Sequence, residues 1–131
     1  MAIKKYHLGC NYVLSIISGK WKPSIICSLG LEEKRYGQLK KYIEAIYSHD
    51  VTDKVLSEQL NQLVHDQIVH RDSFPTIPPK VVYSLTPEGA KLKKILVSMS
   101  KFGEQLAESS DDDIELDYSA QDMLREIHTT N

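Results

Sequence analysis

The sequence has few of the residues that anchor covalent cross-links, metals or cofactors. Its 131 residues include two cysteines, Cys10 and Cys27, too few for a disulfide scaffold. It has no glycine-rich phosphate loop, no metal-ligand signature and no Ser-His-Asp order with supporting context. The chain places His65, Asp66 and His70 close in sequence, but such a group at a helix end is more often solvated than metal-bound. We therefore expect no catalytic site, no metal and no cofactor.

Long apolar runs are also missing. No stretch approaches the roughly 20 apolar residues that a membrane-spanning helix requires. Residues 1–7 lack the apolar segment of a signal peptide. A chain of this length buries one core, and a second independent domain would be small. The sequence therefore predicts one cytoplasmic domain followed by a tail, with no membrane partner.

Charge is distributed unevenly along the chain. Residues 1–108 carry 15 Lys and Arg against 11 Asp and Glu, a net +4, whereas residues 109–131 carry one against seven, a net −6. We take 1–108 as the folded domain and 109–131 as an acidic tail, with a short helix possible from Ser119 onward. A mildly basic body suits a phosphate-bearing partner such as DNA without proving one.

A hairpin is the clearest local feature, and it runs from Ile68 to Gly89. Residues 68–74 alternate between two faces, β-branched residues open a second strand at Val81, and three prolines hold the loop between them. Thr86 can then cap a helix whose first position is Pro87. The second strand is therefore expected to lead directly into a helix, as the wing of a winged-helix protein does.

Helical patterns flank this hairpin. Trp21 lies in a predicted core face, and Cys27 is expected to be buried beside it. A short extended piece is expected at Arg35 and Tyr36, followed by a helix, a polar connector and a second helix that Thr52 caps. The apolar residues at helical spacing in the two later helices are Leu39, Tyr42, Ile43 and Ile46, then Leu56, Leu60 and Leu63.

Two helices followed by a hairpin have the order of a helix-turn-helix with a wing, an α+β fold. In the second of these helices, from Thr52 to about His65, the polar side chains face away from the leucines. There Lys54, Ser57 and Asn61 could bond base edges or phosphates in the major groove. An ordinary solvated helix face is the alternative, and the following wing favours the DNA-binding interpretation.

The helix after the hairpin carries a long apolar stripe opposed by lysines. Packing within one small chain could cover part of it, but the length favours a C-terminal dimerisation helix, and a two-fold protein matches an inverted-repeat operator. The residues of the stripe are Leu92, Ile95, Leu96, Met99, Phe102 and Leu106.

Over roughly residues 10–106, the sequence resembles the HxlR-type winged-helix regulators, a bacterial branch related to the MarR superfamily. The residues that carry the resemblance are Cys10, Ile17-Ser18-Gly19-Lys20-Trp21-Lys22, Arg35-Tyr36-Gly37-Gln38-Leu39, Asp53-Lys54-Val55-Leu56-Ser57-Glu58-Gln59-Leu60, Val69-His70-Arg71, Pro78-Pro79-Lys80-Val81-Val82-Tyr83-Ser84-Leu85-Thr86-Pro87-Glu88-Gly89 and Phe102-Gly103. Two features depart from the family pattern. The connector over residues 44–52 is about five residues longer than usual, and Glu58 places an acid on the DNA face.

The resemblance implies a homodimeric, DNA-binding transcriptional regulator and adds Arg71 and Lys80 as wing contacts to phosphate or the minor groove. Repression is the default expectation, because a dimer lying over a promoter needs only to block it, although some members of the family activate. The expected DNA-binding set is therefore Thr52, Lys54, Ser57, Asn61, Arg71 and Lys80.

Some members of this family sense oxidants through an N-terminal cysteine, and Cys10 aligns with that position. Lys4, Lys5 and His7 lie nearby in sequence and would favour a thiolate. The alternative is that Cys10 is a small packed residue. Two further alternatives are regulation by a small-molecule ligand and a winged helix that serves as a protein-interaction module; the inducer is unknown.

Overall fold

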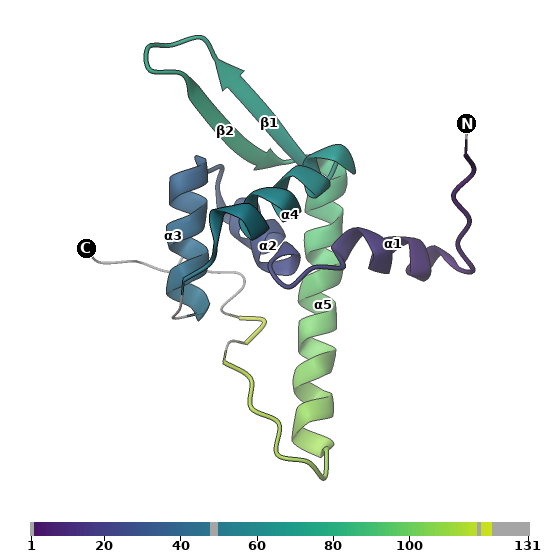
Figure 1. The fold of residues 1–131 in the computed structure, drawn as a ribbon. Helices are drawn as coiled ribbons and strands as arrows, with labels where there is room; N and C mark the ends of the chain where they lie inside the picture. The colour runs from purple at the N-terminus through teal and green to yellow at the C-terminus, as the bar shows by residue number, and fades with distance from the viewer. Residues whose placement is uncertain (1, 48–49, 118, 122–131) are drawn as a thin grey trace.

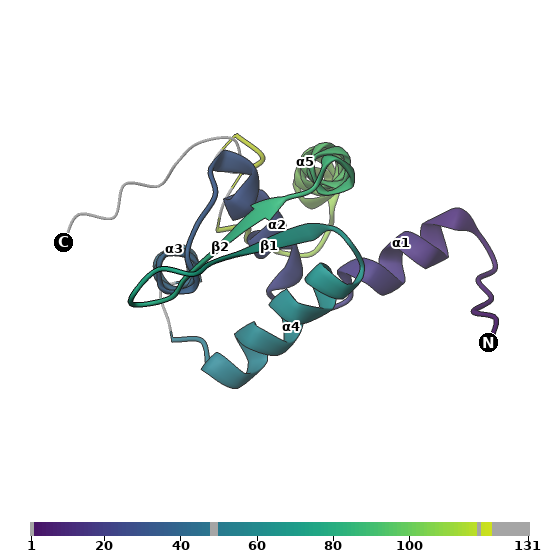
Figure 2. The same ribbon diagram turned by 90° about the horizontal axis from the view of Figure 1, so that it is seen from above.

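Five helices and a two-stranded sheet make up the described part of the chain, residues 2–47, 50–117 and 119–121 of a computed structural model. In chain order they are α1 (Gly9–Ile17), α2 (Lys22–Leu31), α3 (Tyr36–Tyr47), α4 (Asp53–His65), β1 (Val69–Phe74), β2 (Lys80–Leu85) and α5 (Pro87–Ser109). In Figures 1 and 2, α2, α3 and α4 form a body from which the hairpin, α1 and one end of α5 project. The fold is the winged helix-turn-helix that the sequence predicts.

The core lies where the apolar faces of α2, α3 and α4 meet. Trp21 is buried, as expected, and its ring meets that of Tyr47 edge-on with 4.6 Å between centroids. From α4 come Leu56, Leu60 and Leu63, all fully buried. Full burial of each such side chain contributes roughly 1.5–3 kcal/mol. This stripe fixes which face of α4 stays outside.

A close contact between the turn before α2 and α4 accounts for the Gly19-Lys20-Trp21 motif. A Cβ on Gly19 would lie 2.8 Å from Gln59 Oε1. The same oxygen accepts a hydrogen bond from the Trp21 N–H at 2.9 Å. Glycine leaves room for this approach, so the start of α2 is held directly on α4.

The hairpin pairs β1 with β2 along the full length of both strands, antiparallel. On one face of β1, His70 Nε2 lies 2.8 Å from Asp72 Oδ1. On the other face, Arg71 Nη1 donates to Ser73 Oγ at 3.2 Å. These two pairs confirm the predicted alternation of side chains.

A single residue, Lys34, adds a third extended segment beside β2. It exchanges backbone hydrogen bonds with Tyr83, at 3.0 Å from the Lys34 N–H and 2.8 Å from the Tyr83 N–H. The predicted extended piece at Arg35 and Tyr36 is therefore wrong by one residue, because Tyr36 already begins α3. This contact anchors the wing to the segment between α2 and α3.

The junction between β2 and α5 follows the prediction. Thr86 caps α5, since its Oγ1 accepts from the Gly89 N–H at 3.0 Å, and Pro87 is the first residue of the helix. The Thr86 N–H also donates to the Ile68 carbonyl at 3.1 Å. A Cβ on Gly89 would overlap that same carbonyl oxygen. The start of the wing and the start of α5 are thus in direct backbone contact.

Large apolar side chains remain uncovered on α1 and α5. The predicted stripe of α5 divides, because Leu92 and Leu96 are buried in the core and the other four side chains are 48% to 60% exposed. Helix α1 projects from the body (Figure 2), and none of its residues is fully buried. The exposed members of the stripe are Ile95, Met99, Phe102 and Leu106.

The segment after α5 turns back along that helix (Figure 1). The Ala120 N–H donates to Glu104 Oε1, and Ala120 is buried. The short helix predicted from Ser119 onward lies mainly outside the described residues. Within the described part of the chain, no helix combines the length and apolar character needed to cross a bilayer.

Candidate nucleic-acid interface

The face of α4 that points away from the core is polar. Lys54, Glu58, Asn61 and His65 are exposed, as helical spacing predicts, and Ser57 is half-buried on the side toward α3. Because the leucine stripe is fixed in the core, these side chains keep a constant orientation relative to the body. The helix therefore presents hydrogen-bond donors and acceptors from a rigid support.

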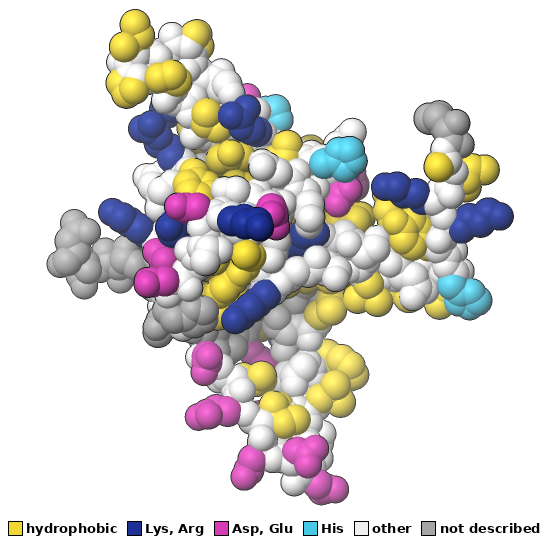
Figure 3. All heavy atoms as spheres, in the orientation of Figure 1, with side chains coloured by type: hydrophobic (Ala, Val, Ile, Leu, Met, Phe, Trp, Pro, Cys, Tyr) yellow, Lys and Arg dark blue, Asp and Glu magenta, His cyan; other side chains and the backbone are white. Residues whose placement is uncertain are grey.

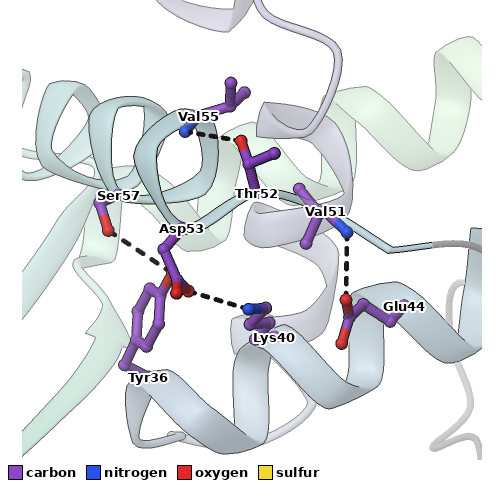
Figure 4. Close-up of polar contacts among 8 residues, drawn as sticks. All are labelled: Tyr36, Lys40, Glu44, Val51, Thr52, Asp53, Val55 and Ser57. Carbon is purple, nitrogen blue, oxygen red and sulfur yellow. Dashed lines mark hydrogen bonds and ion pairs between the residues drawn. The ribbon is translucent and has the colours of Figure 1, made fainter.

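Four polar side chains join the N-terminal end of α4 to α3 (Figure 4). The Tyr36 hydroxyl donates to Asp53 Oδ1 at 2.7 Å, and Lys40 Nζ lies 3.0 Å from the same oxygen. Ser57 Oγ donates to the Tyr36 hydroxyl at 3.5 Å. Asp53 is in the first turn of α4, where a negative charge also interacts favourably with the helix dipole.

Burial and the contacts among Tyr36, Lys40 and Asp53 shift the pKa of each side chain. Hydrogen bonds from Tyr36 and then from Lys40 hold the pKa of Asp53 below its ordinary 3.8. Burial raises the pKa of Tyr36 above its ordinary 10. The bond to Asp53 raises the pKa of Lys40. At neutral pH, Asp53 is therefore a carboxylate and Tyr36 retains its proton.

The long connector is tied at both ends. Val51 is buried, and its N–H donates to Glu44 Oε2 at 3.1 Å (Figure 4). Thr52 then caps α4 as predicted, with Oγ1 accepting from the Val55 N–H at 3.3 Å. Part of the extra length belongs to α3, which continues to Tyr47. The connector is thus anchored to the helices at each side of it.

The wing bears its two predicted cations on opposite faces. Lys80 lies directly across from Phe74, with Nζ 5.4 Å from the ring centroid. Because faces alternate along β1, Arg71 is on the other side of the hairpin from Phe74. At the tip, the Ile77 side chain is 100% exposed. Figure 3 shows the apolar tip with Lys and Arg side chains below it.

Acidic side chains gather at the opposite end of the molecule. In Figure 3 they lie around the C-terminal end of α5 and the segment after it. The exposed residues there include Asp111, Asp112, Asp113 and Glu115. The charge separation predicted along the sequence is thus also a separation in space, with the wing and α4 away from the acidic end.

An open groove of about 670 Å³ separates the end of α1 from α4. Lys22 is buried at this groove, and its Nζ donates to the Ile16 carbonyl at 3.1 Å. Burial lowers the pKa of Lys22, although Asp66 opposes the shift. The residues that line it are Ser15, Ser18, Lys22, Glu58, Asn61, Gln62, His65 and Asp66.

The two cysteines have different environments. Cys10 is an exposed free thiol in the first turn of α1, so the alternative of a small packed residue is wrong for the single chain. Cys27 is buried as predicted, and burial raises its pKa to about 11. A thiol is reactive as the thiolate, so Cys27 is chemically inert and Cys10 is accessible to oxidants.

Sequence reasoning missed the part that Tyr36 and Asp53 play. The acid after Thr52 is a visible signal, because carboxylates are favoured in the first turn of a helix. Its partner is 17 residues away, however, on a different helix. Only the packing of α3 against α4 brings the two together.

Comparison with known proteins gives consistent matches. The sequence pattern of the HxlR-like helix-turn-helix family matches residues 16–111. A protein of Fusobacterium mortiferum named as a regulatory protein, MalR, is 42% identical over 102 residues, 77% of this chain and 92% of that protein. A structure described as a MarR-family transcriptional regulator of Enterococcus faecalis V583 is 37% identical with a TM-score of 0.68, covering 80% of this chain and 91% of its own. The redox regulator HypR in its oxidized form is 31% identical with a TM-score of 0.63, covering 80% and 98%.

Proposed function

Because the chain belongs to the HxlR-like helix-turn-helix family of transcriptional regulators, we propose that it represses transcription by binding an inverted repeat in double-stranded DNA as a homodimer. The observation that carries the proposal is the polar outer face of α4, fixed by three buried leucines beside a wing with two cations. In a winged helix-turn-helix the second helix of the motif enters the major groove. A dimer bound across a promoter represses by blocking it.

The chemistry of the outer face suits this role. In our proposal Asn61 reads an adenine edge and Lys54 bonds guanine acceptors or a phosphate, while Thr52 and Ser57 contribute hydroxyls near the start of α4. Glu58, exposed on the same helix, would repel phosphate and is tolerated where it accepts from a cytosine amino group.

The wing would lie in or along the adjacent minor groove. Cations on its two faces, Arg71 and Lys80, suit the two phosphate strands that border such a groove. The exposed apolar tip at Ile77 is of the kind that contacts sugar and base edges there.

Two uncovered apolar surfaces support the homodimer. The four exposed residues of the α5 stripe and helix α1, none of whose residues is fully buried, both offer large side chains that a single chain leaves in water. An isologous interface buries such a patch on both copies at once. Association through α5 would hold two wings and two α4 helices in one symmetric unit.

Alanine variants of α4 test the DNA interface. Asn61→Ala should weaken binding to the preferred operator by roughly fivefold to 150-fold and relax the preference at one base pair. If Lys54 contacts a phosphate, Lys54→Ala should weaken binding to operator and random DNA alike. It should also reduce the slope of log affinity against log salt concentration by about 1. Fluorescence anisotropy over a salt series measures both effects.

Lys101→Ala is the control, because Lys101 is exposed near the far end of α5. It should leave affinity unchanged. If no duplex binds the wild-type protein better than random DNA, the alternative of a protein-interaction module is favoured instead.

We further propose that Cys10 is the redox-responsive residue. Its support is the exposure of the thiol in α1, the inert state of Cys27, and the similarity to the redox regulator HypR. Oxidation of two Cys10 thiols across the dimer would release two protons and two electrons to the oxidant and form one disulfide. The disulfide would shift the α4 helix and wing of one copy relative to those of the other.

Diamide, which accepts those two electrons and protons, tests this proposal. Wild-type protein should change its operator affinity on treatment and run as a covalent dimer on a non-reducing gel. Cys10→Ser should do neither, whereas Cys27→Ala should behave as the wild type. An unchanged response of Cys10→Ser would contradict sensing at Cys10, and a response to a ligand in the groove beside α4 would then be the next candidate.

A further inference from the structure

The Ser57 hydroxyl is the first donor in a chain of hydrogen bonds that ends at the Asp53 carboxylate (Figure 4). Ser57 Oγ donates to Tyr36, Tyr36 donates to Asp53, and Lys40 donates to the same carboxylate oxygen as Tyr36. The last acceptor of the chain is therefore an anion. Nothing in the sequence pattern alone links Ser57 to α3.

The direction of the chain follows from counting protons. The Asp53 carboxylate has none to give, so the single proton of the Tyr36 hydroxyl must point at it over the 2.7 Å contact. The lone pairs of the tyrosine oxygen are then left to accept from Ser57 at 3.5 Å. Ser57 also has one hydroxyl proton, and this contact, which is long for an O–H···O hydrogen bond, favours an inward direction for it. Toward a group outside the protein, the Ser57 hydroxyl is therefore left to act as an acceptor through its two lone pairs.

Packing and hydrogen bonds fix the position of the Tyr36 hydroxyl. Its ring is partly buried against the hydrophobic core, and it begins α3, whereas Asp53 and Ser57 are both on α4. One hydroxyl therefore bridges two helices and bonds two side chains one turn apart. The raised pKa of Tyr36 and the lowered pKa of Asp53 keep the donor protonated and the acceptor charged over the neutral range.

We propose that Tyr36 is a specificity-determining residue that acts through Ser57: it makes the Ser57 hydroxyl an acceptor, so that the position Ser57 reads prefers a base with an exocyclic amino group. In the major groove these bases are cytosine, through N4, and adenine, through N6. Guanine O6 and thymine O4 are acceptors and leave the lone pairs of Ser57 without a donor. Tyr36 contacts no base and is a positioning residue. The inference rests on the proposed function, since it assumes that α4 enters the major groove.

Selection of bound sequences from a randomised duplex library tests the proposal. Wild-type protein should enrich one base pair by roughly fivefold or more at one position of each half-site, the pair whose cytosine or adenine amino group faces Ser57. Tyr36→Phe keeps the ring and removes the hydroxyl, so Ser57 becomes free to donate as well as accept. The enrichment at that one position should fall to near twofold or less, with other positions unchanged. Ser57→Ala should lose the same preference, and the double variant should add nothing to Ser57→Ala.

Two more variants separate this role from a general effect on the fold. Lys40→Met removes the other donor to Asp53 but leaves the bond from Ser57 to Tyr36, so the base preference should survive. Asp53→Ala frees the tyrosine proton and should relax the preference as Tyr36→Phe does, and it serves if Tyr36→Phe does not fold. Thermal unfolding of each variant checks that the domain is intact.

The possible failures are distinguishable. If Ser57→Ala loses the preference but folded Tyr36→Phe keeps it, Tyr36 does not act through Ser57. A Tyr36→Phe effect spread over all positions, or a Ser57→Ala profile identical to the wild type, would also overturn the proposal. If wild-type protein enriches no sequence, the proposed function itself fails, and this inference fails with it.

Discussion

Replacement of Gly89 with alanine is expected to lower the free energy of unfolding by about 3 kcal/mol. Gly89 is in the first turn of α5, where a Cβ would overlap the carbonyl oxygen of Ile68. That oxygen already accepts from the Thr86 N–H, so it cannot move away without breaking the junction between wing and helix. Alanine ordinarily favours a helix over glycine by about 1 kcal/mol, and here the steric overlap reverses the sign.

Chemical denaturation measures this loss, with Gly37→Ala as the matched control. Gly37 is also in the first turn of a helix, but a Cβ there meets no atom within 4 Å. Gly37→Ala should be neutral or slightly stabilising. A Gly89→Ala protein as stable as the wild type would show that Ile68 and the start of α5 are not packed as described.

The second large effect is expected from Phe102→Glu. Phe102 is 60% exposed in the single chain and lies within the uncovered stripe of α5. Burial of a phenylalanine contributes roughly 1.5–3 kcal/mol, and a carboxylate in its place would have to be desolvated without a partner. Self-association should weaken at least roughly a hundredfold. Analytical ultracentrifugation at micromolar concentration should find monomers where the wild type is dimeric.

Lys101→Glu is the control for charge, because Lys101 is exposed beside Phe102 but outside the apolar stripe. It changes the charge by more than Phe102→Glu does and should leave the dimer intact. The monomeric Phe102→Glu variant should bind an inverted repeat no better than a half-site. A dimeric Phe102→Glu protein, or a monomeric wild type, would contradict assembly through α5.

Most of the fold could be predicted because its determinants are local. The leucines of α4 repeat at helical spacing, the residues of β1 alternate, and Thr86 with Pro87 marks the start of a helix. Each of these signals concerns neighbours in sequence, and the structure confirms them. The buried states of Trp21 and Cys27 were predictable for the same reason, since both lie in one apolar helical face.

The features that escaped prediction depend on contacts between distant segments. The extended segment was misplaced because Lys34 is selected by pairing with Tyr83, about 50 residues later. The carboxylate of Asp53 finds Tyr36 only after α3 packs on α4. Gly89 reads as part of a helix start, and its contact with Ile68 becomes visible only in three dimensions. Whether the stripe of α5 is covered likewise depends on assembly, which one chain does not contain.

The same junction has a consequence for regulation. α5 carries the proposed dimer surface at one end and meets the start of the wing at the other, through Thr86, Gly89 and Ile68. A change in how two copies pack along α5 would therefore be transmitted to the wing through backbone contacts. This is the route by which we expect oxidation at Cys10 to alter DNA binding.

Binding of the purified wild-type protein to genomic DNA, followed by affinity measurements on the selected sites, tests the central claim most directly. We expect an inverted repeat to be enriched, a half-site to bind far more weakly, and log affinity to fall with log salt at a slope of roughly −0.9 for each phosphate neutralised. Enrichment of no sequence over random DNA, or equal affinity for the half-site and the full repeat, would contradict a dimeric, sequence-specific regulator.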